Sequence, residues 1–289
     1  GIALAAQRKM VRIGVVLFDT GNPFFDEVMD GLRQKLEELS IYGCTVIERR
    51  ISFDLQSQLQ TIDELLKEEI HGLILSPYND PAIQEKIDLL WENGIPCITI
   101  NTDMPDSKRI AYVGSDYHKC GQTAAGLLHL FSGDYASVGI VTGSHNVLCH
   151  EERISGFTSH LHTKHPNIRI VDVVENGDDD YKSYEVVSDL LDRHPDLSAL
   201  YFTAAGVYGG CRAVLNASLQ RPLKIITFDA VLSTCEMIRN GVISATICQQ
   251  PDEQGARSLS LLVDYLLTGK LPENRCIYMD LSIKIAENL

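Results

Sequence analysis

The stretch that decides the fold is VRIGVVLFDTGNPFF, residues Val11 to Phe25. Its apolar, β-branched first half predicts a buried strand over 11–18, the next residues predict a tight loop, and an amphipathic helix pattern follows directly. At such a junction an open α/β sheet presents side chains to a ligand crevice. We expect Asn22, Phe24 and Phe25 to face that crevice, where a carboxamide and two phenyl rings suit a sugar. Packing of both rings in the core is the alternative.

The same alternation of apolar strands and amphipathic helices continues along the chain and restarts near residue 114. Fully apolar strands separated by helices predict parallel sheets covered on both faces. The expected fold class is therefore α/β, with two doubly wound lobes. One lobe comprises 11–114 plus about 250–272, and the other comprises 115–245 plus about 277–289, with a short strand pair closing the chain. Since no low-complexity linker separates them, we expect crossing strands that act as a multi-strand hinge beside an interlobe ligand cleft.

Composition excludes several classes of function. The 289 residues carry 39 acidic and 25 basic side chains, a net charge of −14, which opposes binding of a phosphate backbone by this chain. No run is long and apolar enough for a membrane span, and the first residues lack the pattern of a signal peptide. The eight scattered cysteines form no CxxC pair, which predicts buried thiols in the cytoplasm; disulfides in an exported protein are the alternative.

Polar side chains recur where the predicted strands end, which is where a crevice between two such lobes would lie. Amides, carboxylates and one arginine in such positions suit adjacent hydroxyl groups. The candidates are Asn101, Asp103, Arg153, Asp229 and Gln249. For Asp103 and Asp229, helix capping or turn formation is the alternative.

Three further segments invite a chemical interpretation. The glycine-rich segment 204–210 lacks a phosphate-binding pattern, so we interpret it as close backbone approach to a neutral ligand or to packing partners. His160, His162 and His165 straddle a helix end and predict no metal site. The acidic run 178–180 predicts helix capping rather than calcium binding. No catalytic motif is present, and we expect no catalytic residue, cofactor or metal.

Four short motifs carry a family resemblance: NPFF at 22–25, RISGF at 153–157, FD at 228–229 and TICQQP at 246–251. Together they resemble the ribose-binding-protein and lac-repressor superfamily over residues 11–289. The resemblance implies a hinged, type 1 periplasmic-binding-protein-like fold that holds a sugar between its lobes. The contacts that it implies are Asn22, Phe24, Phe25, Asn101 or Asp103, Arg153, Tyr181, Asp229 and Gln249, with backbone contacts from Ala205 and Gly206.

Residues 1–10 resemble the linker that joins a DNA-binding headpiece to the sensor of lac-repressor-type regulators. We therefore expect a cytoplasmic, homodimeric, sugar-responsive effector domain that catalyses no reaction and reaches operator DNA only through a headpiece absent from this chain. Two alternatives remain open. One is the soluble sugar receptor of a transporter, and the other is an enzyme on the same fold.

Overall fold

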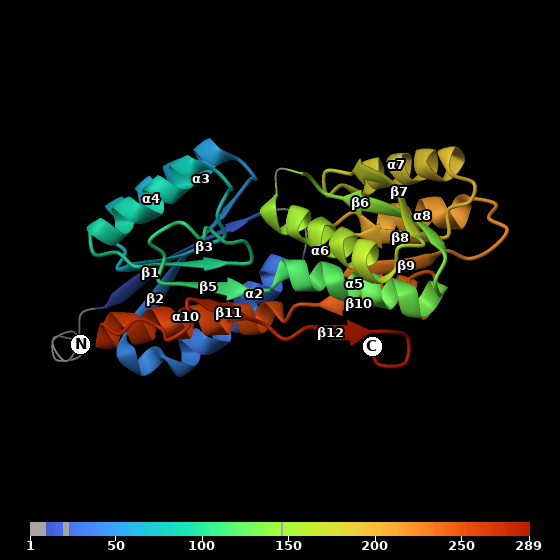
Figure 1. Ribbon diagram of the computed structural model, residues 1–289. Coiled ribbons are helices and arrows are strands. Elements are labelled where there is room, and N and C mark those ends of the chain that lie inside the picture. The colour runs from blue at the N-terminus through green and yellow to red at the C-terminus, as the bar shows by residue number, and fades with distance from the viewer. Residues whose placement is uncertain (1–9, 20–22, 146) are drawn as a thin grey trace. The chain divides into compact units, whose positions relative to one another are not determined.

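The computed structural model describes residues 10–19, 23–145 and 147–289, which form two compact units (Figure 1). The first unit contains the described residues up to Ser115 together with Gln250–Met279. The second contains Asp116–Gln249 and Asp280–Leu289. The chain therefore passes from one unit to the other three times, and each unit is built from segments that are distant in the sequence.

The first unit alternates strands and helices as the sequence predicts. Its elements are β1 (Val11–Phe18), α2 (Phe24–Glu38), the 3₁₀ turn η1 (Ser40–Tyr42), β2 (Cys44–Ile51), α3 (Leu55–Lys67), β3 (Gly72–Leu75), α4 (Pro81–Glu92), β4 (Cys97–Ile100), β5 (Ala111–Gly114), α10 (Pro251–Thr268) and β11 (Cys276–Tyr278). In Figure 1, α3 and α4 cover one face of the sheet, and α2 and α10 cover the other.

The second unit repeats this plan. Its elements are α5 (Tyr117–Ser132), β6 (Ala136–Thr142), α6 (Leu148–Lys164), β7 (Ile168–Glu175), α7 (Asp180–Arg193), β8 (Ala199–Phe202), α8 (Val207–Asn216), β9 (Lys224–Phe228), α9 (Leu232–Arg239), β10 (Ala245–Cys248) and β12 (Ser282–Lys284). Here α5 and α6 pack together on one face of the sheet, and α7 and α8 pack together on the other (Figure 1).

The two sheets have equivalent strand orders, β11-β5-β4-β3-β1-β2 and β12-β10-β9-β8-β6-β7. All described pairings are parallel except β10 with β12. In each sheet the direction of winding reverses beside the first strand, between β1 and β3 or between β6 and β8. Ligands of open α/β sheets bind at the carboxyl ends of the strands beside such a reversal.

Local chemistry explains where the helices begin. Asp54, Asp80, Asp116 and Asp179 each precede a helix, and each carboxylate accepts a hydrogen bond from a backbone N–H of the first turn. Such caps satisfy donors that the helix itself leaves unpaired. Pro81 follows one of these caps at the first helical position, where its missing N–H costs nothing.

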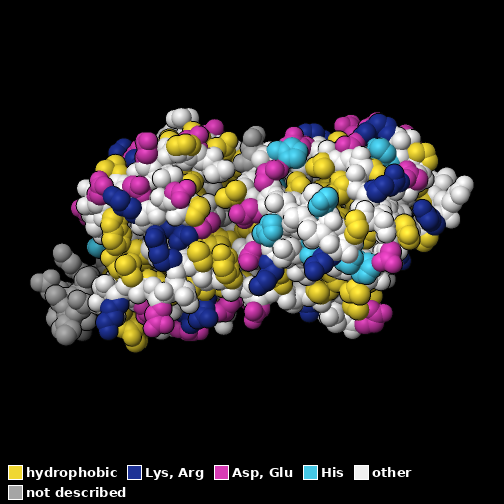
Figure 2. All heavy atoms as spheres, viewed as in Figure 1, with side chains coloured by type: hydrophobic (Ala, Val, Ile, Leu, Met, Phe, Trp, Pro, Cys, Tyr) yellow, Lys and Arg dark blue, Asp and Glu magenta, His cyan; other side chains and the backbone are white. Residues whose placement is uncertain are grey.

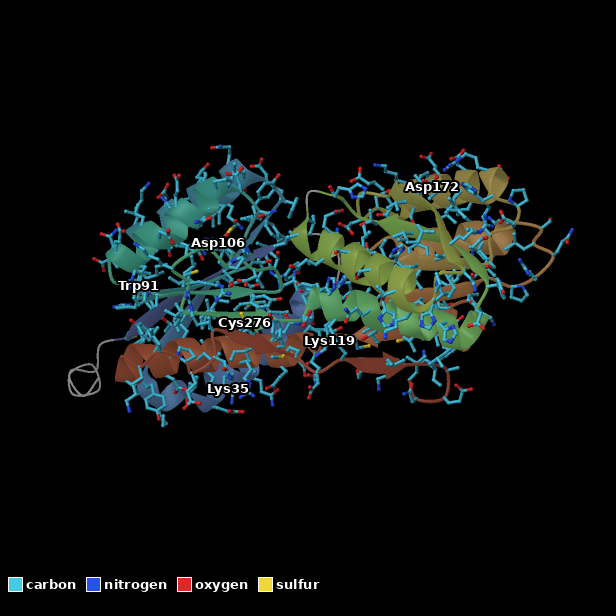
Figure 3. The ribbon with its side chains drawn as sticks, in the orientation of Figure 1. Lys35, Trp91, Asp106, Lys119, Asp172 and Cys276 are labelled. Atoms are coloured by element: carbon cyan, nitrogen blue, oxygen red, sulfur yellow. The ribbon has the colours of Figure 1, made fainter. Side chains whose placement is uncertain are left out.

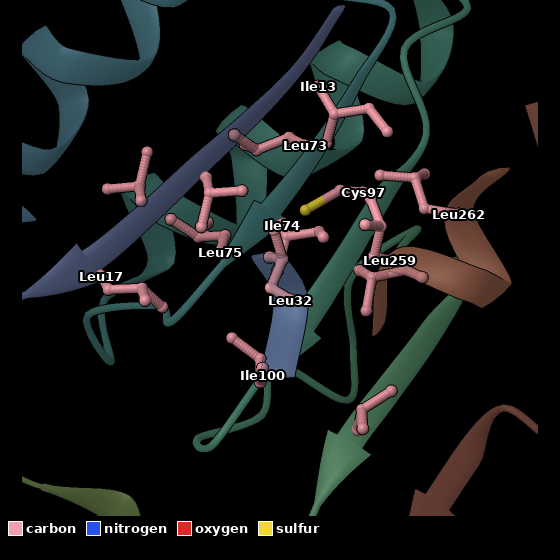
Figure 4. Packing of buried hydrophobic residues seen from close by; sticks show 14 of the residues in the cluster. Ile13, Leu17, Leu32, Leu73, Ile74, Leu75, Cys97, Ile100, Leu259 and Leu262 are labelled. Carbon is pink, nitrogen blue, oxygen red and sulfur yellow. The ribbon is translucent and has the colours of Figure 1, made fainter. Parts of the chain in front are cut away.

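The core of the first unit is a continuous apolar cluster between its sheet and helices (Figure 4). Ile13 and Leu17 of β1 lie in this cluster with Ile74 of β3, and each is fully buried. Leu259 and Leu262 extend the cluster from α10, which enters the first unit late in the sequence. Burial of these side chains stabilises the fold by roughly 1.5–3 kcal/mol each.

Reciprocal glycines bring two helices of each unit into backbone contact. In the first unit, a Cβ on Gly31 would lie 1.9 Å from the Asp252 carbonyl oxygen, and a Cβ on Gly255 would lie 1.9 Å from that of Val28. In the second unit, the same arrangement pairs α5 with α6: Gly121 faces the Arg153 carbonyl, and Gly156 faces the His118 carbonyl. Only glycine permits these approaches.

The end of the chain corrects the sequence analysis. Two short strands close the chain, as expected, but they do not pair with each other: β11 joins the first sheet beside β5, and β12 joins the second sheet beside β10. Residues 277–279 therefore belong to the first unit rather than to the second lobe. Cys276 marks β11 in Figure 3.

No disulfide joins the eight cysteines, all of which lie in the described part of the chain; five are buried and three are partly buried. Within the described ranges, no helix is both long and apolar enough to cross a membrane. Acidic and basic side chains are interspersed over the face shown in Figure 2.

Candidate functional site

Phe24 and Phe25 form the first turn of α2, at the carboxyl end of β1. Both rings are buried, with exposed fractions of 5% and 6%, and they meet edge to face with centroids 5.3 Å apart. Both belong to the hydrophobic cluster of the first unit, which agrees with the core alternative that the sequence left open. Their contact with a sugar stays a prediction. Asn22 lies outside the described residues.

Asp103 is engaged inside the first unit. Its carboxylate accepts hydrogen bonds from Arg109, with Nη2 at 2.6 Å, and from the Thr99 hydroxyl at 2.8 Å and the Met104 N–H at 2.7 Å. Arg109 also donates to the carbonyl of Arg275, so the carboxylate fastens this loop to the segment before β11. Contact of Asn101 or Asp103 with a sugar stays a prediction.

Asn101 and Asp229 occupy equivalent places, each directly after the fourth strand of its sheet. Each has a φ of +64°, in the left-handed region that non-glycine residues rarely adopt. Each donates its backbone N–H to the next strand, at Val113 or Ile247. Strained backbone of this kind persists where the surroundings enforce it and is concentrated at functional sites.

Arg153 is a buried charged residue of the second unit. Its side chain is 4% exposed, its Nη1 donates to the Thr203 carbonyl at 2.5 Å, and its guanidinium carbon lies 3.8 Å from the Phe228 ring centroid and 4.8 Å from that of Tyr117. Within the described part of the chain, its Nε has no hydrogen-bond partner. A buried donor without a partner costs free energy, so this group is available to a ligand.

The equivalence of the two units shows that helix packing does not require this arginine. Arg153 precedes Gly156 by three residues on α6, as Val28 precedes Gly31 on α2, and their carbonyls face the equivalent glycines Gly121 and Gly255. Val28 is a fully buried core residue. An arginine in the same position adds a desolvated charge that packing alone does not explain.

Asp229 and Gln249 complete the polar cluster. Gln249, 2% exposed, follows β10 and donates its Nε2 to the Asp229 carboxylate at 2.8 Å. Burial raises the pKa of Asp229, and the nearby Arg153 charge and the Gln249 hydrogen bond partly oppose that rise. The cluster thus offers charged and amide groups of both polarities beside two aromatic rings, a combination that suits hydroxyl groups on an apolar ring.

The loop before α8 packs closely within the second unit, which is one of the two interpretations that the sequence left open for this segment. The Ala205 N–H donates to Asp178 at 3.0 Å, and the Gly209 N–H donates to Asp180 at 2.9 Å. A Cβ on Gly206, whose φ is +80°, would lie 2.4 Å from the Asn176 amide nitrogen. Close packing within the unit therefore explains these glycines, and the Ala205 N–H is already used. Ligand contact by Gly206 stays a prediction.

The acidic run 178–180 acts as a cap only in part. Asp179 caps α7, as predicted, whereas Asp178 accepts from the loop before α8 at Ala205 and Asp180 accepts from the first turn of α8 at Gly209. Tyr181, in the first turn of α7, is 85% exposed, and its stacking on a ligand stays a prediction.

In the described ranges, no group of three or more His, Cys, Asp or Glu side chains is arranged to hold a metal.

The sequence analysis missed Tyr117 and His150. Tyr117 is the first residue of α5 and is buried against Arg153; its only sequence signal is the preceding Asp116 cap. His150 lies in the first turn of α6, 8% exposed, and accepts a hydrogen bond at Nδ1 from the Ser144 N–H at 3.3 Å. Burial is the main cause that lowers the pKa of His150 to about 4, with Arg153 acting in the same direction and Asp178 against it.

This shift predicts a pH-dependent stability. The unfolded chain binds a proton at His150 near pH 6.5 and the folded chain only near pH 4, so the free energy of unfolding is expected to fall as the pH is lowered through that window. Urea titrations across the window measure this. His150→Asn is expected to reduce the slope, whereas His162→Asn, at an exposed position on the same helix, is the control. An equal slope in both variants and the parent contradicts the prediction.

With the geometry established, comparisons with known proteins decide the family. The periplasmic binding protein domain matches residues 13–271. The chain belongs to this family. A similar relative is the ribose import binding protein RbsB of Bacillus subtilis, 26% identical over 266 residues that cover 92% of this chain and 85% of the relative.

Solved structures of periplasmic binding proteins share the fold. GanP, a glucose-galactose binding protein from Geobacillus stearothermophilus, superposes with a TM-score of 0.89 at 24% identity, covering 97% of this chain and 99% of GanP. A structure from Bacteroides fragilis that is named as a putative LacI transcriptional regulator superposes with a TM-score of 0.87 at 22% identity, covering 97% of this chain and 98% of that one. The expected fold class, two α/β units with parallel sheets of the type 1 periplasmic-binding-protein kind, is confirmed.

Proposed function

We propose that this chain is a sugar receptor that binds a neutral monosaccharide at the strand ends of its second unit and serves sugar import. The observation that carries the proposal is the cluster of Arg153, Asp229 and Gln249 beside the Phe228 and Tyr117 rings. An import function is supported by the relative from B. subtilis, which is named for ribose import. We also infer that the sugar is bound without turnover.

The charged groups of the second unit favour a neutral ligand over a sugar phosphate. The Arg153 charge already interacts electrostatically with the Asp229 carboxylate, which limits what remains for an anion. The N-terminal end of α8, the usual place for a phosphate, is occupied by Asp178 and Asp180. An added phosphate would therefore meet fixed negative charge in the same unit.

Thermal unfolding with a panel of sugars tests the proposal. D-ribose, D-glucose and D-galactose follow the names of the relatives, and D-ribose 5-phosphate is the charged control. At about 100 times its Kd, a bound sugar is expected to raise Tm by roughly 5–10 °C, whereas the phosphate raises it by less than about 1 °C. Recovery of the bound sugar unchanged would support binding without turnover. If no neutral sugar raises Tm, or only the phosphate does, the proposal fails.

A second candidate function is the effector-binding domain of a homodimeric, cytoplasmic lac-repressor-type regulator. The eight free thiols are consistent with a reducing compartment, and the fold is shared with the regulator from B. fragilis. The sequence upstream of this chain in its gene discriminates the two. A helix-turn-helix would support the regulator and its contact with operator DNA, and a signal peptide would support the import receptor.

A further inference from the structure

Two buried hydroxyl groups occupy equivalent places in the two sheets. Tyr112 on β5 and Thr246 on β10 each precede a residue whose carbonyl accepts the backbone N–H of a left-handed residue. Val113 accepts from Asn101, and Ile247 accepts from Asp229. The Tyr112 hydroxyl lies 2.9 Å from the carbonyl oxygen of Asn101, and the Thr246 hydroxyl lies 3.0 Å from that of Asp229. Different side chains thus supply the same donor to the same backbone position.

We propose that Tyr112 and Thr246 are positioning residues that hold Asn101 and Asp229 in the left-handed conformation, and that in the second unit this conformation presents Asp229 to the sugar. The inference rests on the proposed function. A non-glycine residue with a φ of +64° is strained, so the chain must be held from more than one side. The backbone N–H of each residue is held by the adjacent strand, and the hydroxyl holds the carbonyl. Together they fix both peptide groups that flank the side chain.

The two hydroxyls differ in how firmly they act. The Tyr112 hydroxyl also lies 2.9 Å from the carbonyl oxygen of Ser115, and one hydroxyl proton serves only one carbonyl at a time. A Cβ on Gly114 would lie 2.2 Å from the Tyr112 oxygen, so glycine is required for the ring to reach this place. Because Tyr112 divides its proton between two acceptors, Thr246 is expected to be the stronger positioning residue.

Matched variants separate positioning from general stability. Thr246→Val and Tyr112→Phe remove each hydroxyl with little change in shape. Thr99→Val is the control, because Thr99 is a fully buried threonine on β4 whose hydroxyl donates to Asp103 rather than to a left-handed residue. Thr246→Ser keeps the donor and is the conservative rescue. All four are measured by urea unfolding, by calorimetric titration with the panel sugar that raises Tm most, and by amide exchange without sugar.

We expect Thr246→Val to weaken sugar binding about fivefold, whereas Thr246→Ser and Tyr112→Phe, which lies in the first unit, should bind close to the parent. Thr99→Val is expected to lower stability without changing affinity. Without sugar, the Asn101 amide should exchange faster in Tyr112→Phe, and the Asp229 amide faster in Thr246→Val. Unchanged exchange in both variants, or an equal loss of affinity in Thr99→Val, overturns the proposal. If the parent binds no panel sugar, the proposed function fails, and the exchange rates alone decide whether the hydroxyls hold these residues.

Discussion

Gly121→Ala is expected to destabilise the second unit by about 3 kcal/mol or more. The new methyl group would lie 2.1 Å from the Arg153 carbonyl oxygen and 2.6 Å from the Phe157 nitrogen. Both are backbone atoms of α6, so no side-chain rotation relieves the clash and the two helices must separate. Since α6 carries Arg153, the displacement is also expected to weaken sugar binding at least tenfold.

Gly126 provides the control on the same helix. A Cβ at Gly126 meets nothing within 4 Å, and alanine is a better helix former than glycine, so Gly126→Ala is expected to raise stability by about 0.5–1 kcal/mol. Urea unfolding and calorimetric titration of both variants give the comparison. If Gly121→Ala is as stable as Gly126→Ala, the close contact between α5 and α6 does not constrain the unit.

The alternation of strands and helices was predictable because the spacing of apolar residues that marks a strand or a helix depends only on residues close together in the sequence. The run from Val11 to Phe18 is apolar except at Arg12, the strands β3, β4 and β8 are buried at every position, and aspartate caps mark several helix starts. The last two strands were not predictable in their pairing. β11 and β12 are three residues each, and the partner of such a short strand is decided by distant segments, β5 and β10, that sequence order does not bring together.

The candidate site was predictable in its polar residues but not in their roles. Arg153, Asp229 and Gln249 were found because polar residues after apolar strands are visible in the sequence, and the structure brings them together. Asp103 has the same signal, yet its carboxylate is used by Arg109, a partner that only the folded loop reveals.

The closest backbone contacts left no usable signal in one sequence. The four glycines that join α2 to α10 and α5 to α6 look like ordinary helix glycines until the opposite backbone is in place. Asp178 and Asp180 similarly resemble caps of the helix that follows them, although their carboxylates accept from Ala205 and Gly209, more than twenty residues away at the start of α8. Contacts of this kind depend on tertiary structure, so local pattern cannot assign them.

Arg153→Met is expected to weaken sugar binding about 100-fold or more and to lower the free energy of unfolding by about 3 kcal/mol. Methionine keeps much of the apolar volume beside Phe228 and Tyr117 but removes every donor. The loss of affinity follows from the missing charge-assisted hydrogen bonds. The loss of stability follows because the Asp229 carboxylate remains buried without its cation.

The double variant Arg153→Met with Asp229→Asn separates these two effects. Removal of the carboxylate charge is expected to restore much of the stability, since the unpaired buried charge is gone. The asparagine side-chain oxygen can still accept the hydrogen bond from Gln249 Nε2. Sugar binding is expected to remain lost, because no donor replaces the guanidinium. A double variant that is no more stable than Arg153→Met would show that the Asp229 charge is not what the arginine compensates. Sugar binding at parental affinity in Arg153→Met would remove this cluster from the proposed site, whatever its contribution to folding.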